Sequence, residues 1–442
     1  MFLLICLSLG SCLLYLRTTM RRIILTSITF LTFCTFLQPA HATPLTYHYK
    51  HYLFTITTSE QRDWKHPQEV WTYEGKPIMP PAKLRVDGDS VPNLPEGFAR
   101  SQVWTFDSVR IAQTINDIVA GSVNRMPGSV EIRRASTGSI VFHGVGLPGR
   151  SVDVTSATNL SIEALESGLT DILLPVNETA PTVTVLDGTL THQGITELVT
   201  VGESDFSRSP SNRRHNIAVG LSKFNGHLIP AGSIFSFDET LGRVDDTTGY
   251  LKELVIKGDQ TIPDFGGGLC QVSTTAYRGV WEYGLPILTR KNHSYMVSHY
   301  SPQGTDATVY PPGADMRFKN TTSGALLMQT YAEGDNAYFL YYGTRDRRSA
   351  QIYGPFTWDR KPPPPEKTQP TLDLPPGEIK KVGEAVPGMH AAWFRVVQKD
   401  GKESVQGTYS IYEARPLFHL IGVASLPGGS GAVALPDAGD IN

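Results

Sequence analysis

The sequence predicts a strand-rich α+β protein built from several domains. Its 442 residues include 41 glycines and 31 prolines, which separate many short runs of β-branched and aromatic residues. Short runs of this kind, bounded by turn residues, are typical of β-strands, whereas only a few segments repeat apolar residues at helical spacing. The length is sufficient for two to four domains.

Residues 1–42 are predicted to direct export. An apolar stretch follows Arg21 and Arg22 and ends in Ala40-His41-Ala42, which is the layout of a secretory signal peptide cleaved after Ala42. Two alternatives stay open: a membrane anchor, although neither apolar run reaches the roughly 20 residues of a span, and a lipoprotein site at Cys12. We therefore expect an exported protein of the cell envelope, in the periplasm or cell wall, with membrane anchoring as the alternative.

The composition also bears on partners and cofactors. Cleavage removes three arginines and no acids, which changes the formal net charge from −3 to −6. A mildly acidic chain without a basic run argues against nucleic acid as the partner. The sequence has no nucleotide, flavin or metal motif, so we expect no cofactor and no metal.

Residues 43–104 form an aromatic and proline-rich segment, in which residues 47–54 are predicted to be one strand. This strand carries His48 and His51. Because no further ligand cluster accompanies them, both histidines are predicted to lie on the surface rather than to bind a metal.

Residues 105–190 are predicted to form an α+β binding module. A helical stripe opens it, two strands pair around a turn at residues 136–138, and a second helix follows Asn159 and stops at Gly168. A strand over residues 171–176 closes the module. No catalytic constellation is present in it.

Residues 196–345 contain the candidate chemistry and form an α+β catalytic domain. The proline-rich residues 355–377 are predicted to be a stiff linker. Residues 378–420 then form a small all-β module, whose strands alternate around the hairpin turn Asp400-Gly401. The Gly/Ala-rich residues 421–442 are predicted to be a disordered tail.

Cys270 is the one cysteine after the N-terminal region. It follows Gly266-Gly267-Gly268 and precedes a helix ended by Gly284, so it lies at or just before the first helical turn. The helix dipole and unpaired N–H groups there favour the nucleophilic thiolate. Gly267 and Gly268 give a substrate carbonyl close access to the backbone N–H groups of an oxyanion hole. The alternative is a tight turn in which Cys270 fills the core.

Two histidines downstream are candidate bases for this thiol. Residues 290–300 and 306–309 are predicted to form a β-hairpin around a turn at residues 301–304. If Tyr300 pairs with Asp306, His299 lies beside Asp306 and His293 lies nearer Asp315. Spacing alone leaves the His293–Asp315 and His299–Asp306 arrangements both open.

The sequence around these residues resembles the VanW domain, and the resemblance covers about residues 196–345. The segments that carry it are Gly266-Gly267-Gly268-Leu269-Cys270-Gln271-Val272-Ser273-Thr274-Thr275, Arg290 with His293-Ser294, Gly304 with Asp306-Ala307-Thr308-Val309, and, upstream, Arg214 with Asn216, residues 234–238 and Gly249-Tyr250. Residues 105–190 resemble the peptidoglycan-binding domain that commonly precedes VanW. The C-terminal module resembles, more loosely, small adhesive domains that often follow it.

The resemblance implies an envelope protein that acts on peptidoglycan stem peptides. Some members of the family are described as L,D-transpeptidases, which use the cysteine to make cross-links through a thioester. By position, Cys270 is then the nucleophile, His293 the base and Asp306 the acid, with the partner of Asp306 left open. We expect Arg290, Ser294 and Gln271 to contact the substrate. The alternatives are a non-catalytic peptidoglycan-binding protein, and a cysteine peptidase or carboxypeptidase of wall peptides.

Overall fold

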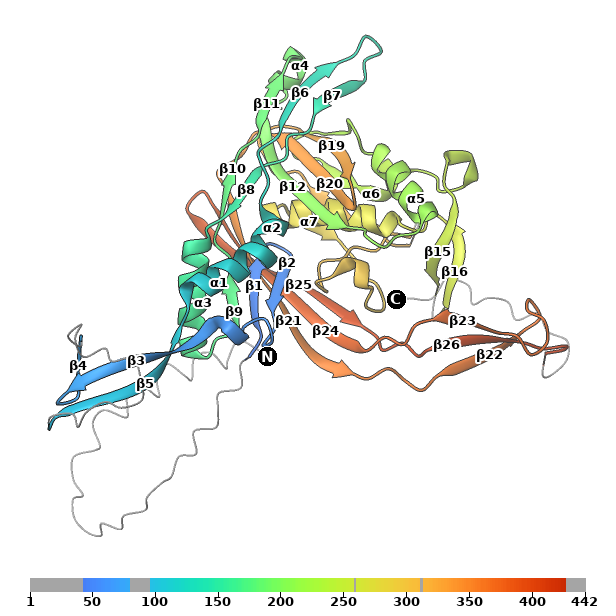
Figure 1. The fold of residues 1–442 in the computed structure, drawn as a ribbon. Coiled ribbons are helices and arrows are strands. Elements are labelled where there is room, and N and C mark those ends of the chain that lie inside the picture. Colours follow the sequence, from blue (N-terminus) through green and yellow to red (C-terminus); the bar gives the residue numbers. More distant parts are fainter. Residues whose placement is uncertain (1–42, 80–95, 258–259, 311–312, 427–442) are drawn as a thin grey trace, which may run out of the picture. The chain divides into compact units, whose positions relative to one another are not determined.

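The structure is a computed structural model that describes residues 43–79, 96–257, 260–310 and 313–426. The predicted signal peptide at 1–42 and the predicted tail from Pro427 onward lie outside these residues. Strands outnumber helices along the described chain, which confirms the strand-rich α+β class (Figure 1). None of the helices in the described ranges combines the length and apolar character that crossing a membrane requires.

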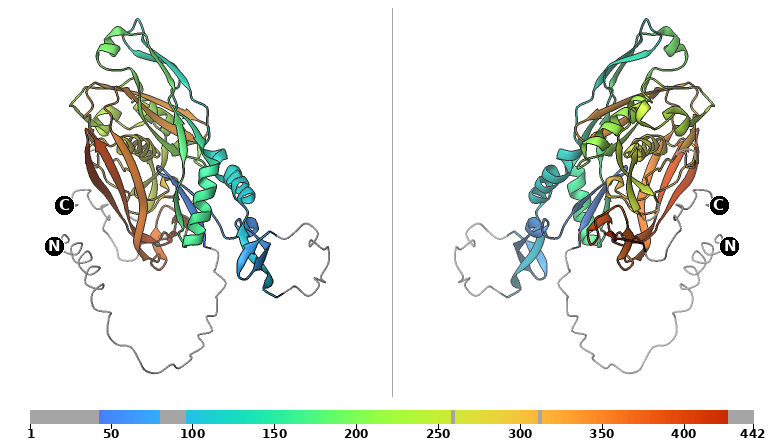
Figure 2. Two further views of the ribbon diagram at one scale, coloured as in Figure 1. Left: turned by 90° about the vertical axis from the view of Figure 1, so that its left-hand side faces the viewer. Right: turned by 90° about the vertical axis from the view of Figure 1, so that its right-hand side faces the viewer.

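The N-terminal hairpin packs with elements from further along the chain. This unit contains β1 (Leu45–Tyr49), β2 (Tyr52–Ile56), β9 (Asp171–Leu173), α1 (Ser108–Thr114), a π-helical segment (Ile115–Ala120), α2 (Gly121–Val123) and α3 (Val154–Ser167). Strand β1 pairs antiparallel with β2 and parallel with β9, and α1 packs beside α3 (Figure 2). Tyr47, Ile111 and Ile115 are buried in one shared core. Residues 43–56 therefore belong with the module that was predicted to begin at residue 105.

Two predictions in this unit are wrong. The predicted single strand over residues 47–54 reverses at Lys50, whose φ is +52°, and becomes the β1–β2 hairpin. This turn buries His51, which is 2% exposed and whose Nδ1 lies 2.6 Å from Glu282 Oε1, so His51 is not a surface residue. His48 is partly buried, and its Nε2 lies 2.7 Å from Asp171 Oδ1.

Helix α3 begins earlier than predicted. Asp153 caps it by accepting a hydrogen bond from Ser156 N, so the helix starts at Val154 rather than after Asn159. A short acidic side chain before the first turn is the favoured N-cap. Gly168 ends the helix with φ +72°, as predicted.

Three smaller sheets lie in the first half of the described chain. They contain β3 (Lys65–Tyr73), β4 (Lys76–Ile78) and β5 (Phe98–Phe106); β6 (Ser129–Arg134), β7 (Ile140–Gly144) and β11 (Thr182–Val185); and β8 (Gly149–Val152) with β10 (Val176–Thr179). The sheet with β6, β7 and β11 shares its core with strands of residues 197–343. The short helices nearby are a 3-10 turn (Arg62–Trp64) and α4 (Gly188–His192). The predicted pairing around residues 136–138 is confirmed as β6 with β7.

The region with the candidate chemistry is built on a sheet of order β12-β20-β19-β13. Its elements are β12 (Glu197–Asp205), α5 (Ser211–Ser222), β13 (Leu228–Ile229), β14 (Ile234–Ser236), α6 (Phe237–Leu241), a 3-10 turn (Asp246–Thr248), β15 (Lys252–Lys257), β16 (Gln260–Phe265), α7 (Leu269–Tyr283), β17 (Ile287–Thr289), a 3-10 turn (Ser298–Tyr300), β18 (Arg317–Lys319), β19 (Leu326–Glu333) and β20 (Asn336–Gly343).

Helix α7 lies directly on this sheet (Figure 1). The approach is close enough that a Cβ atom at Gly202 of β12 would lie 1.9 Å from Thr275 O, and one at Gly279 would lie 2.6 Å from Gly202 N. Two facing glycines therefore let the helix and strand meet. The apolar stripe of this helix, which consists of Val272, Ala276 and Val280, is fully buried in the core.

The C-terminal module contains two sheets of order β21-β24-β25 and β22-β26-β23. Their strands are β21 (Ser349–Lys361), β22 (Lys367–Thr371), β23 (Ile379–Gly383), β24 (Gly388–Lys399), β25 (Lys402–Tyr412) and β26 (Phe418–Gly422). The predicted hairpin around Asp400-Gly401 is confirmed as β24 with β25.

The predicted linker over residues 355–377 is wrong. Much of it lies in β21 and β22, and both strands are at an edge of their sheet. An edge strand leaves one side of its backbone unpaired, so it tolerates prolines that a central strand excludes. The predicted tail also began too early, because β26 continues to Gly422.

Candidate active site

Cys270 is the second residue of α7, as predicted. The preceding glycine turn has positive φ angles at Gly266 (+81°) and Gly268 (+117°). A Cβ atom at Gly268 would also lie 3.1 Å from both Arg213 O and Ile217 Cγ1. The backbone conformation and the limited space both require glycine at this position. The turn places the thiol at the positive end of the helix dipole.

A buried asparagine on α5 holds the glycine turn in place. Asn216 is 0% exposed. Its Nδ2 donates to Gly267 O at 3.0 Å and to Leu251 O at 2.9 Å, while its Oδ1 accepts from Leu251 N at 2.8 Å. In the described part of the chain, the N–H groups of Gly268 and Cys270 have no protein acceptor. Both donors can therefore bind a ligand oxygen.

The loop between β17 and β18 carries a histidine paired with a carboxylate. His293 Nδ1 lies 2.6 Å from Asp306 Oδ2, and the same oxygen accepts from His293 N at 2.8 Å. Both residues are buried, with exposures of 5% and 0%. Ala307 N donates to Thr274 Oγ1 of α7 at 3.0 Å, which fixes this loop against the helix of the thiol.

The second carboxylate oxygen of Asp306 is also bonded. Oδ1 accepts from Arg290 Nη2 at 3.1 Å and from the hydroxyl of Tyr412. Asp306 therefore accepts two hydrogen bonds on each oxygen, and one of its donors comes from the C-terminal module. Full pairing of this kind is what a buried carboxylate requires.

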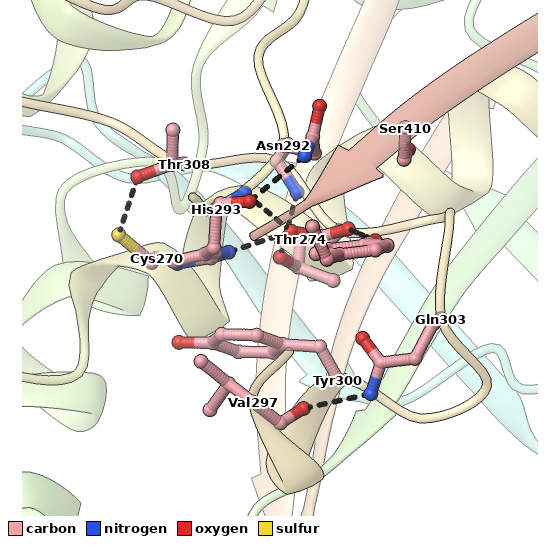
Figure 3. A network of polar contacts seen from close by, with 12 residues as sticks. Cys270, Thr274, Asn292, His293, Val297, Tyr300, Gln303, Thr308 and Ser410 are labelled. Atoms are coloured by element: carbon pink, nitrogen blue, oxygen red, sulfur yellow. Dashed lines mark hydrogen bonds and ion pairs between the residues drawn. The ribbon is translucent and has the colours of Figure 1, made fainter. Parts of the chain in front are cut away.

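The thiol and the imidazole lie in a defined environment (Figure 3). Cys270 Sγ is 3.5 Å from Thr308 Oγ1. It is also 3.6 Å from Val309 O. The Tyr300 ring stacks on the His293 ring, with centroids 4.5 Å apart and an interplanar angle of 19°. Stacking on one face and the Asp306 bond at one edge together fix the orientation of the imidazole.

The electrostatics favour a thiolate–imidazolium pair. Burial raises the pKa of the Cys270 thiol, but the hydrogen bond and the charge of His293 outweigh burial and lower that pKa to about 7. Burial lowers the pKa of His293, but Asp306 and the Cys270 sulfur outweigh it and raise that pKa to about 9. Burial also acts against ionisation of Asp306, yet His293 and Arg290 hold its pKa well below the usual range. Between these two pKa values Cys270 is the anion and His293 the cation.

The structure brings His293 and Asp306 together, and neither arrangement left open by spacing occurs. The predicted hairpin is wrong, because residues 298–300 form a 3-10 turn and the segments meet only in a bridge between Lys291 and Thr308. Asp315 instead accepts from Ser236 Oγ and Asp238 N. His299 lies on the 3-10 turn, and the side-chain bonds of Asp306 go to His293, Arg290 and Tyr412 instead.

Two of the three predicted substrate contacts are used internally. Arg290 is tied to Asp306, and its side chain is 5% exposed. Gln271 is 0% exposed, and its Nε2 donates to Ser204 Oγ at 2.7 Å. Neither side chain is available to a substrate, so those predictions are wrong. Ser294 is exposed beside His293, and its contact with substrate stays a prediction.

The comparisons with known proteins match the same part of the chain. The family model described as VanW like protein matches residues 212–342, a range that includes Cys270, His293 and Asp306. The chain therefore contains a VanW-like domain over these residues. The match ends before β21, so the C-terminal module lies outside the VanW-like domain.

Two relatives share part of this domain. The chain is 32% identical over 139 residues to "Uncharacterized protein YoaR" of Bacillus subtilis (strain 168), an alignment that covers 31% of this chain and 46% of the relative. It is 27% identical over 117 residues to "Vancomycin B-type resistance protein VanW" of Enterococcus faecalis (strain ATCC 700802 / V583), with 25% of this chain and 42% of the relative covered. The chain thus spans less than half the length of these curated relatives. No solved structure matches the chain.

Several residues of this site escaped the sequence analysis. Thr308 carried a usable signal, because it lies two residues after Asp306 and side chains two apart on extended chain point the same way. Asn216 was noted only as part of the resemblance. Tyr300 and Tyr412 carried no local signal, since their roles arise from contacts made in the folded chain. Among the described residues, no group of His, Cys, Asp and Glu has the arrangement of a metal site.

Proposed function

We propose that this protein with a VanW-like domain is an exported, cell-wall-associated cysteine acyltransferase that works as an L,D-transpeptidase on peptidoglycan stem peptides. The observation that carries the proposal is the buried, hydrogen-bonded pair of Asp306 and His293 beside the Cys270 thiol. A nucleophile, a base within reach and a third group that orients the base form the arrangement used for covalent acyl transfer. The leader-like residues 21–42 support export.

The proposed first step forms a thioester. The Cys270 thiolate attacks the carbonyl between a diamino acid and a terminal D-alanine, and the C–N bond breaks as His293 gives its proton to the departing amine. The N–H groups of Gly268 and Cys270, which lack protein acceptors in the described residues, are the donors we assign to the oxyanion. Such donors stabilise the charge that develops on the carbonyl oxygen.

The second step transfers the acyl group. The side-chain amine of another stem peptide attacks the thioester, neutral His293 takes the amine's proton, and the thiolate leaves. Transfer to water instead gives a carboxypeptidase with the same residues. Asp306 remains ionised throughout, because it holds the imidazole orientation and stabilises its cation.

The VanW-like domain supports the cell wall as the place of action. The name of the Enterococcus faecalis relative refers to vancomycin B-type resistance, and vancomycin is a drug directed at peptidoglycan. A purely peptidoglycan-binding role would give no reason for a partly buried thiol beside an imidazole that lowers its pKa to about 7. The chemistry of the thiol therefore favours the enzyme over the binding protein.

Mass spectrometry of muropeptides tests the proposal. Purified residues 43–442 are incubated with disaccharide-tetrapeptides, in parallel with Cys270→Ala. We expect a cross-linked dimer that lacks one D-alanine with the wild-type protein and no dimer with the variant. Trimmed monomers would point to the carboxypeptidase. Unchanged muropeptides together with an unreactive thiol would contradict the enzyme and favour the binding protein.

A further inference from the structure

The loop that carries Asp306 rests on the C-terminal module. Trp393 Nε1 of β24 donates to Gln303 O at 2.7 Å, and Gly304 N donates to the hydroxyl of Tyr412 at 2.7 Å. A Cβ atom at Gly304, whose φ is +103°, would lie 2.7 Å from Trp393 Cδ1. The loop therefore approaches the β24–β25 hairpin closely, and the absence of a side chain at Gly304 permits the contact.

The end of β25 also runs beside His293. Asn292 Nδ2 donates to Ile411 O at 2.8 Å, and Glu413 N donates to Ser294 O at 2.7 Å. The residues on either side of His293 are thus bonded to the residues on either side of Tyr412. This arrangement sets the Tyr412 side chain against the carboxylate to which His293 is bonded.

Arg290 ties the same strand to the acid from another direction. Its Nη1 donates to Ser410 Oγ at 2.9 Å and to Tyr409 O at 3.2 Å, while its Nη2 donates to Asp306 Oδ1 at 3.1 Å. Strand β25 therefore supports both donors that bind Asp306 Oδ1.

We propose that Tyr412 is a positioning residue of the acyl transfer, which holds Asp306 in the orientation that His293 requires and makes the C-terminal hairpin part of the catalytic unit. This inference rests on the proposed function and extends it beyond the VanW-like domain, which ends at residue 342.

A phenol suits this position because one oxygen has to serve two neighbours. The Tyr412 hydroxyl donates to Asp306 Oδ1 and accepts from Gly304 N, so it fixes the carboxylate and the loop backbone together. Tyr412 is 2% exposed. Burial, followed by the charge of Asp306, raises the pKa of Tyr412 far above its ordinary value, so the hydroxyl keeps its proton wherever the thiolate forms. Phenylalanine fills the same space but offers neither bond.

Tyr412→Phe tests the inference without requiring turnover. After removal of residues 1–42, Cys270 is the one cysteine in the chain, so alkylation by iodoacetamide reports on that thiol alone. If the acid–imidazole pair loosens, we expect the thiol pKa to rise by about one and the alkylation rate near neutral pH to fall about fivefold, because the thiolate fraction drops from about one half to about one tenth. Tyr353→Phe, on strand β21 of the same sheet, is the matched control and should leave the rate unchanged.

The result that would overturn the inference is a folded Tyr412→Phe protein, by thermal unfolding, with the wild-type alkylation profile. A faster alkylation rate and a lower thiol pKa would also overturn it. They would mean that the Tyr412 hydrogen bond only weakens the negative charge of Asp306 and does not position the carboxylate. NMR titration of the His293 ring provides an independent measurement. If Tyr412 holds Asp306 against His293, the pKa of His293 should be lower in Tyr412→Phe than in the wild-type protein. If the wild-type thiol is unreactive, the proposed function fails, and the His293 titration still decides the role of Tyr412.

Discussion

Replacing Asp306 by asparagine should disable the thiol while keeping the shape of the site. Asp306 accepts two hydrogen bonds on each carboxylate oxygen. Asparagine has one acceptor oxygen, so two of these donors would face an NH2 group, and the negative charge beside His293 would be lost. The imidazolium would then lose its main electrostatic partner.

The size of the effect follows from the site. The pKa of His293 is raised from 6.5 to about 9, and a difference of this size corresponds to about 3 kcal/mol. Asp306 and the thiolate share that net stabilisation, which remains after burial has opposed it, so about 3 kcal/mol sets the scale of the change rather than the contribution of the carboxylate alone. If the thiol pKa returns from about 7 toward 9.0, the thiolate fraction near neutral pH falls by about 10- to 50-fold.

The assay is the pH dependence of iodoacetamide alkylation, with thermal unfolding to verify the fold. Asp315→Asn is the matched control, because Asp315 was the alternative acid and the structure bonds it to Ser236 and Asp238. We expect a raised thiol pKa in Asp306→Asn and a wild-type profile in Asp315→Asn. A folded Asp306→Asn protein with unchanged alkylation, or an equal change in both variants, would refute the reasoning.

The remaining predictions concern pH and the glycine turn. Thioester formation should rise with pH as the thiol ionises near pH 7 and should fall as His293 loses its proton near pH 9; a single-turnover pH profile without the fall would exclude His293 as the proton donor. Gly268→Ala should destabilise the protein by about 2–4 kcal/mol, because a left-handed φ is combined with close contacts. Gly232→Ala, at φ +75° with open space around the position, should lower the free energy of unfolding by less. Equal decreases for the two variants in urea unfolding would contradict the argument that close contacts add to the cost at Gly268.

Local patterns predicted those parts of the fold that local chemistry determines. The apolar stripe of α7 and its end at Gly284 follow from helical periodicity, and the turn at Asp400-Gly401 follows from residues that accept positive φ. The start of α3 was missed because Asp153 and Asn159 are both N-cap residue types, and sequence alone does not rank them.

The predicted hairpin of the active-site loop failed for a different reason. Its aromatic and β-branched residues have the composition of strands, but Tyr295 and Tyr300 are buried by packing rather than by cross-strand pairing. The register that places Asp306 beside His293 is set by contacts to α7 and β25. Composition indicates that such residues are buried, yet it does not indicate which neighbours bury them.

The burial of Asp306 explains why the site depends on residues far from it in sequence. An ionised carboxylate at 0% exposure is tolerated only if donors replace the water that it loses. His293 can satisfy one oxygen, and the nearby chain supplies Arg290 for the other, whereas the last donor is the hydroxyl of Tyr412, 106 residues away. Arg290 in turn needs acceptors of its own, and it finds them at Tyr409 and Ser410. The buried pair of His293 and Asp306 therefore requires the β25 strand, and an isolated segment 212–342 would leave the Asp306 carboxylate short of hydrogen-bond donors.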